Sequence, residues 1–213
     1  MPGAPNRPPE TTPAPPPAPP VPETPAQRAL RRLAPSRVAL LLDAWKGAPS
    51  AELMNPFDRA EAAFAAGDFP NALSALDLLS VRFAEPRWPT LPEPFRQLRV
   101  PIPAPMPPHW DPEHALPVPE KEARRARRAA EEQVALAEAS VAWMSAHQID
   151  TADLAPRIAE AKALLGTEGV VPALYERLDV VWDAVRARVP LPKRTAGRPA
   201  PPRAPAAAEA GEA

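Results

Sequence analysis

Residues 57–83 read FDRAEAAFAAGDFPNALSALDLLSVRF, and this stretch carries the signals of two helices that meet at a tight turn. Apolar residues recur every three or four positions on both sides of Gly67, as they do on the buried face of a helix. Glycine adopts the left-handed conformation that ends a helix, and the carboxylate of Asp68 can cap the helix that follows. The stretch therefore predicts a helical hairpin that turns at residues 67 and 68.

The helical pattern continues upstream of this hairpin. An apolar stripe from Leu30 to Trp45 is interrupted by Pro35, so either a short helix ends near Leu33 or one helix kinks at the proline. The first helix of the hairpin is expected to begin at Asn55-Pro56, because proline is well tolerated in the first turn of a helix.

Three more helices are expected downstream. Apolar periodicity predicts a long helix over about 120–147, another that begins near Pro156, and a last one over about 170–189. The stripe of the last helix is the clearest of all, with large apolar residues at every third or fourth position from Val171 to Val189.

The 36 prolines are concentrated in residues 1–25, 86–119 and 190–213, so both ends of the chain are expected to be disordered. The middle segment also carries large apolar residues, which disordered linkers lack. We expect part of it to lie against the helices, with a short helical turn around PEPFRQLR. The alternative is that its aromatic side chains form a binding motif for a partner protein, for which the candidates are Trp88, Phe95 and Trp110.

The two halves of the chain resemble each other. Residues 44–73 and 142–174 share the same order of features: a tryptophan near a helix end, a capping residue, a proline, Ala-Glu-Ala and a glycine. The matched pairs include Trp45 with Trp143, Pro56 with Pro156, Ala60 with Ala159, and Gly67 with Gly166. This order predicts an internal duplication of a three-helix unit.

The hairpin resembles the tetratricopeptide repeat, a family in which a Gly-Asp/Asn-Tyr turn joins two antiparallel helices. Gly67, Asp68 and Phe69 match that turn, and Ala60 and Ala72 match the small residues that let the two helices pack closely. The resemblance covers only part of the chain. It implies a helical scaffold of the kind that binds other proteins.

Composition limits the classes of function. The 213 residues allow one or two domains, and the net charge of −1 gives no general attraction to nucleic acid or to an anionic membrane. The absence of cysteine excludes disulfides, thiolate metal sites and cysteine nucleophiles. We recognise neither a signal peptide nor an apolar run near the ~18 residues of a membrane span, so we expect a cytoplasmic protein.

No motif of a nucleotide-binding loop, a serine hydrolase or a zinc protease is recognisable, so we expect no enzyme and no cofactor. His109, Asp111, Glu113 and His114 are residue types that zinc prefers, but their spacing matches no zinc pattern known to us. We therefore expect no metal site.

A basic cluster lies near the start of the predicted long helix. Lys121, Arg124, Arg125 and Arg128 share one helical face, which could contact phosphates as a nucleic-acid-binding site. Neighbouring glutamates at helical spacing favour the alternative of a solvated face with ion pairs.

The sequence therefore predicts an all-α protein of two tandem three-helix units, residues 26–84 and 120–189. A proline-rich connector over 85–119 joins them, and the tails are residues 1–25 and 190–213. The predicted function is a non-catalytic scaffold or adaptor that binds protein partners. The sequence predicts neither the identity of these partners nor the oligomeric state of the protein. The alternative is an RNA- or ribosome-associated protein that uses the basic face of the long helix.

Overall fold

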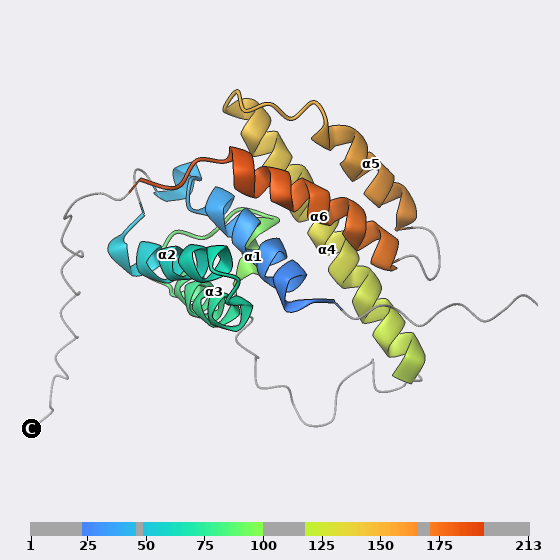
Figure 1. The fold of residues 1–213 in the computed structure, drawn as a ribbon, viewed down its shortest axis with the longest axis horizontal. Coiled ribbons are helices and arrows are strands. Elements are labelled where there is room, and N and C mark those ends of the chain that lie inside the picture. The colour runs from blue at the N-terminus through green and yellow to red at the C-terminus, as the bar shows by residue number, and fades with distance from the viewer. Residues whose placement is uncertain (1–22, 46–48, 100–117, 166–170, 194–213) are drawn as a thin grey trace, which may run out of the picture.

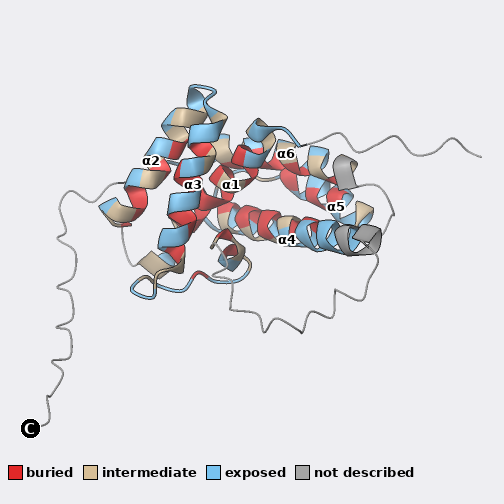
Figure 2. Cartoon of the chain, turned by 90° about the horizontal axis from the view of Figure 1, so that it is seen from below, coloured by how far each residue is buried: buried red, intermediate tan, exposed pale blue. Residues whose placement is uncertain are grey.

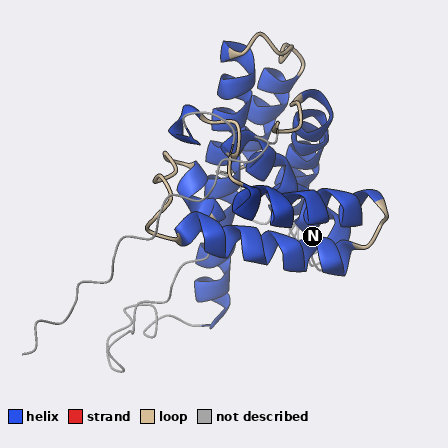
Figure 3. Cartoon of the chain, turned by 90° about the vertical axis from the view of Figure 1, so that its left-hand side faces the viewer, coloured by secondary structure: helices blue, strands red, loops and turns tan. Residues whose placement is uncertain are grey.

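The computed structural model describes residues 23–45, 49–99, 118–165 and 171–193, without the side chains of residues 118–122, 171 and 172. The described part is all-helical, as the sequence predicts, and contains no strand (Figures 1 and 3). Its α-helices are α1 (Pro25–Ala39), α2 (Ala51–Ala65), α3 (Phe69–Ala84), α4 (Val118–Ala146), α5 (Leu154–Leu164) and α6 (Val171–Arg188). Two 3₁₀ helices are η1 (Asp43–Trp45) and η2 (Phe95–Leu98).

Helix α1 lies at the centre of the fold, between the α2–α3 hairpin and the helices α4, α5 and α6 (Figures 1 and 2). It begins at a capping box: the Thr24 hydroxyl accepts from the Gln27 backbone N–H, and the Gln27 side chain accepts from the Thr24 backbone N–H. Every residue from 33 to 40 is buried, so α1 is covered on all sides along its second half. The central position of α1 makes it the helix on which both halves of the chain depend.

Of the two readings that the sequence left open at Pro35, the structure shows one helix that continues through the proline. A proline inside a helix leaves the carbonyl four residues earlier without its usual amide donor. Burial of the flanking side chains Leu33, Ala34 and Val38 offsets that loss, since each is 0% exposed.

The α2–α3 hairpin turns at Gly67 and Asp68, as the sequence predicts. Gly67 has a φ of 75°, and the Asp68 carboxylate accepts a hydrogen bond of 3.3 Å from the backbone N–H of Asn71. The rings of Phe64 and Phe69 meet edge to face across the turn, with centroids 5.5 Å apart.

The predicted start of α2 at Asn55-Pro56 is wrong, because α2 begins four residues earlier, at Ala51. Pro56 is therefore the sixth residue of the helix, where its missing N–H costs one hydrogen bond. The side chains of Leu53 and Met54 explain the difference, because the first turn of α2 packs them into the core, where they are 0% and 2% exposed.

Helices α4, α5 and α6 form the other side of the fold, and their extents agree with the predicted helices. The apolar stripe of α6 is buried, and Trp182 at its centre is 0% exposed. Helix α4 ends with Gln148 in the left-handed conformation, at a φ of 60°, and the Ile149 N–H bonds back to the Met144 carbonyl at 3.0 Å. This is a Schellman-type end in which glutamine stands where glycine is usual.

The two predicted units share one hydrophobic core. Helix α1 makes its most extensive contacts with α6 rather than with α2 or α3, and a single cluster of buried residues runs through both halves. The paired residues of the predicted duplication differ in burial: Ala60 is buried and Ala159 exposed, whereas Ala62 is exposed and Ala161 buried. This difference in burial gives the duplication no support, so the duplication stays a prediction.

Part of the proline-rich segment packs on its own helices. Leu91, Phe95 and Leu98 are buried in the common core, and η2 contacts α1. The apolar residues of the segment beyond Arg99, up to residue 117, lie outside the described residues.

The two left-handed helix ends predict opposite effects on stability. Gly67→Ala should lower the free energy of unfolding by about 1 kcal/mol, since a side chain is strained at this φ. An added Cβ would meet no atom within 4 Å, so the effect isolates backbone strain. Gln148→Gly should instead raise the free energy of unfolding by about 0.5 kcal/mol, and Gln148→Ala should not, because alanine keeps the strained Cβ. Urea unfolding followed by circular dichroism measures all three changes, and stabilisation by Gln148→Ala would contradict this explanation.

Candidate functional site

Two buried arginines of α1 hold the surrounding helices in place. Arg37 is 7% exposed and pairs with Glu61 of α2, while its Nη1 donates to the Val189 carbonyl at 3.0 Å, just after the end of α6. Arg186 of α6 pairs with the same Glu61 carboxylate at 3.0 Å. The last carbonyls of a helix have no partner within the helix, so the Arg37 guanidinium satisfies an otherwise unpaired group. Helices α1, α2 and α6 therefore meet at one ion-paired cluster.

Arg31 forms the second buried cluster, toward the start of α1. Its guanidinium makes two hydrogen bonds to the Asp179 carboxylate of α6, at 2.6 and 2.8 Å, and a third to Glu23 at 2.6 Å. It also lies over the Tyr175 ring, 4.2 Å from the centroid. A forked pair of this kind fixes orientation as well as charge. Arg31 thus holds the Tyr175 ring of α6 against α1.

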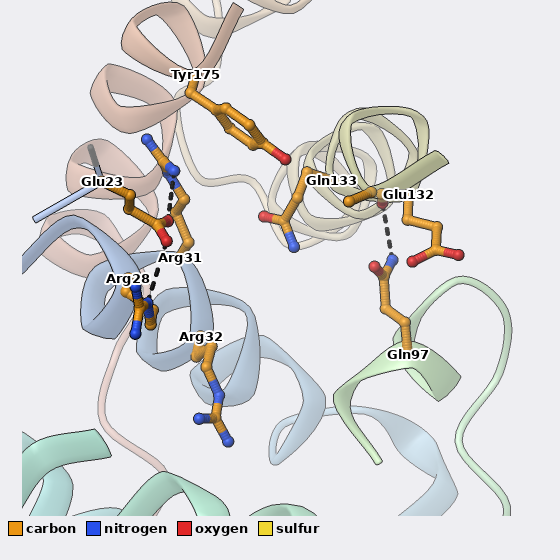
Figure 4. A pocket seen from close by; sticks show the side chains of 9 residues that line it. Glu23, Arg28, Arg31, Arg32, Gln97, Glu132, Gln133 and Tyr175 are labelled. Carbon is orange, nitrogen blue, oxygen red and sulfur yellow. Dashed lines mark hydrogen bonds and ion pairs between the residues drawn. The ribbon is translucent and has the colours of Figure 1, made fainter. Parts of the chain in front are cut away.

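A shallow groove of about 260 Å³ opens beside Arg31, between α1, η2, α4 and α6. Figure 4 shows Tyr175 extending from α6 toward α4, where Gln133 lies, with Gln97 of η2 on the opposite wall. The lining residues are Glu23, Arg28, Arg31, Arg32, Gln97, Ala129, Glu132, Gln133 and Tyr175. These come from four separate parts of the sequence, so no local motif could reveal them.

The groove offers both hydrogen-bond donors and acceptors. The Gln97 amide donates to the Glu132 carbonyl at 2.8 Å, which ties η2 to α4. The Oε1 atom of Gln133 is buried and has no hydrogen-bond partner among the described residues. Burial raises the pKa of the Tyr175 hydroxyl above its usual value, so this hydroxyl stays protonated and can donate at neutral pH. These groups are uncharged, so they can hydrogen-bond to a polar ligand without a change in protonation.

Arginines rim the groove but are partly neutralised. Arg28 pairs with Glu23 at 3.1 Å with 56% of its side chain exposed, and Arg32 pairs with Asp77 at 2.7 Å with 30% exposed. Surface pairs of this kind are weak, so both guanidiniums can exchange their partner for one that arrives from solution.

The basic residues predicted from the sequence lie on the N-terminal part of α4. Arg124, Arg125 and Arg128 are exposed, as is Arg127, which pairs with Glu131 at 3.1 Å. The side chain of Lys121 lies outside the described residues. Arg127 therefore forms an ion pair of the kind that the neighbouring glutamates predict.

The three aromatic candidates for protein binding have different surroundings. Phe95 is 3% exposed and packs in the core, so it is not available on the surface, because η2 turns it toward α1. Trp88 is partly buried against the core, with the Arg87 guanidinium 4.9 Å from its ring centroid. Trp110 lies outside the described residues.

No group of three or more His, Asp or Glu side chains is placed to hold a metal ion within the part of the chain that the structure describes. His109, Asp111, Glu113 and His114 lie outside that part. None of the described helices combines the length and the apolar character needed to cross a membrane.

No protein-family model, no curated protein and no solved structure matches this chain. The assignment of function therefore rests on the residues of the groove and of α4.

The Arg37 cluster predicts a large loss of stability when its charge is removed. Arg37→Met should lower the free energy of unfolding by about 3 kcal/mol, because Glu61 and the end of α6 would lose a buried partner. Arg28→Met, a matched change at an exposed pair, should cost less than about 1 kcal/mol. Urea unfolding measures both. Equal losses for the two variants would show that the Arg37 cluster does not hold the helices together.

Proposed function

We propose that the protein is a non-catalytic helical adaptor and that the groove between α1, η2, α4 and α6 receives a short segment of a partner protein. The observation that carries this proposal is the buried Oε1 of Gln133 at the groove, which has no hydrogen-bond partner among the described residues. A buried acceptor without a partner costs about 1–3 kcal/mol, and a donor from a bound segment would recover that cost.

The size of the groove favours side chains of a protein over a small molecule. Pockets for small ligands usually enclose about 300–1,000 Å³ and are mostly apolar. This groove is smaller, at about 260 Å³. One or two side chains of a partner segment fit such a space.

The groove is held in shape before binding. On one wall Arg31 bonds to Asp179 and lies over the Tyr175 ring, and on the other Gln97 ties η2 to α4. Pre-formed walls reduce the entropy lost on binding, which lets a shallow groove bind a segment with useful affinity.

Site-specific crosslinking tests the proposal. A photoreactive amino acid at Gln97 should crosslink to a defined segment of a partner protein, whereas the same amino acid at Ala155, on the exposed face of α5, should not. A peptide with the crosslinked sequence should then bind the purified protein. Gln133→Leu should weaken that binding about tenfold, since loss of a buried hydrogen bond costs about 1–3 kcal/mol.

A change at the far side of α4 provides the matched control. Glu138→Gln removes an exposed pair with Lys162 away from the groove, and it should leave the affinity of the peptide unchanged. Equal crosslinking at both positions, or a peptide that binds Gln133→Leu as tightly as the unmodified protein, would refute the groove as the binding site.

A further inference from the structure

Helix α4 is exposed around its whole circumference over residues 123–129. Residues 123–129 are all exposed, whereas the next residue, Ala130, is 1% exposed. Figure 1 shows this end of the helix extending past α5 and α6, and Figure 2 shows its exposed surface. These seven residues span about 10 Å at 1.5 Å per residue, and we refer to them as the α4 arm.

Four of the five residues from 124 to 128 in the α4 arm are arginines. At about 100° per residue, their side chains spread over about 160° of the helix circumference. Arg124 and Arg128 occupy the middle of this arc, and Arg125 and Arg127 lie at its two edges. The remaining circumference carries only the small side chains Ala123, Ala126 and Ala129.

The central and the edge arginines differ in their surroundings. Arg127 pairs with Glu131, and Arg125 also has an interaction within the chain. Arg124 and Arg128 have no ion-pair partner among the described residues. They lie one helical turn apart on one face, where like charges repel and destabilise the helix. An anionic partner would convert this repulsion into attraction.

We propose that the α4 arm inserts into the major groove of duplex DNA. An α-helix with its side chains is about 10–12 Å across, and the major groove is about 12 Å wide and 8.5 Å deep. In this orientation Arg125 and Arg127 at the edges of the arc reach phosphates of the two strands. Arg124 and Arg128 in the middle face the groove floor, where guanine offers acceptors that suit arginine.

The composition of the α4 arm favours DNA over an acidic protein. Protein interfaces depend on a few large, well-packed anchors, mostly aromatic, and residues 123–129 contain only arginine and alanine. Phosphate binding needs only a high density of cations. The major groove of duplex RNA is too narrow and deep for a helix, which favours DNA over that alternative. Ala129 at the end of the α4 arm lines the groove of the adaptor proposal, but none of the four arginines does, so the two proposals rest on different side chains.

Fluorescence anisotropy with a labelled DNA duplex of about two helical turns tests this proposal. The full chain should bind at low salt, and the logarithm of the binding constant should fall against log[salt] with a slope of about −2 to −4, since each phosphate contact contributes about −0.9. Arg124→Gln combined with Arg128→Gln should weaken binding about tenfold or more. Circular dichroism should show this double variant folded, because the side chains of Arg124 and Arg128 are exposed.

A matched double variant controls for net charge. Arg59→Gln with Arg157→Gln removes two exposed arginines from α2 and α5, and it should change the affinity less than about twofold. Arg124→Lys with Arg128→Lys keeps the charge but loses the forked donors, so it should weaken binding while the salt slope stays the same. Gln133→Leu should leave DNA binding unchanged.

Four outcomes would overturn the proposal. The first is that the protein does not bind duplex DNA at low salt, and the second is that the control variant in α2 and α5 loses as much affinity as the variant in α4. The third is that an RNA duplex binds as tightly as DNA, and the fourth is that a polyglutamate peptide does so. The last two would assign the α4 arm to RNA or to an acidic protein instead.

Discussion

The guanidinium of Arg37 needs partners from both halves of the chain at once. It is buried on the central helix α1, where a charge is stable only if it is paired and hydrogen-bonded. Glu61 of α2 supplies the opposite charge, and the carbonyl of Val189 after α6 supplies a further acceptor. Neither α2 nor the end of α6 can satisfy Arg37 alone, so this side chain requires both helices to lie against α1.

The same arrangement creates the two surfaces to which we assign binding. Because α1 packs against α6, Arg31 reaches Asp179 and fixes Tyr175 beside α4, which forms one wall of the groove. Because α4 extends past α5 and α6, the arginines of the α4 arm project from the body of the protein (Figure 1). The packing of α1 against α6 therefore forms the groove, and the greater length of α4 leaves the α4 arm exposed.

The sequence predicts the helices well where a local signal marks their ends. Gly67 and Asp68 set the hairpin turn, and the apolar stripe of α6 sets its buried face. The start of α2 was wrong because Pro56 is a favourable first-turn residue, and only the burial of Leu53 and Met54 extends the helix past it. A local preference was overridden there by packing.

The candidate site was much harder to predict than the helices. Periodicity treats arginine as a surface residue, so it gave no reason to bury Arg31 or Arg37, and their partners lie far away in the sequence. The walls of the groove come from four separate segments, and only the fold brings them together. The basic face of α4 could be found because its arginines are neighbours in the sequence.

Native-state hydrogen exchange is the most direct test of α1 as the shared core. The slowest amides of α1, α3 and α6 should exchange with the same opening free energy and the same dependence on denaturant, because unfolding one half exposes α1 to water and unfolds the other. The opening free energy of the slowest amides in α4, α5 and α6 could instead differ from that in α1, α2 and α3 by more than about 1 kcal/mol. Such a difference would contradict this account, since it would show two units that unfold separately.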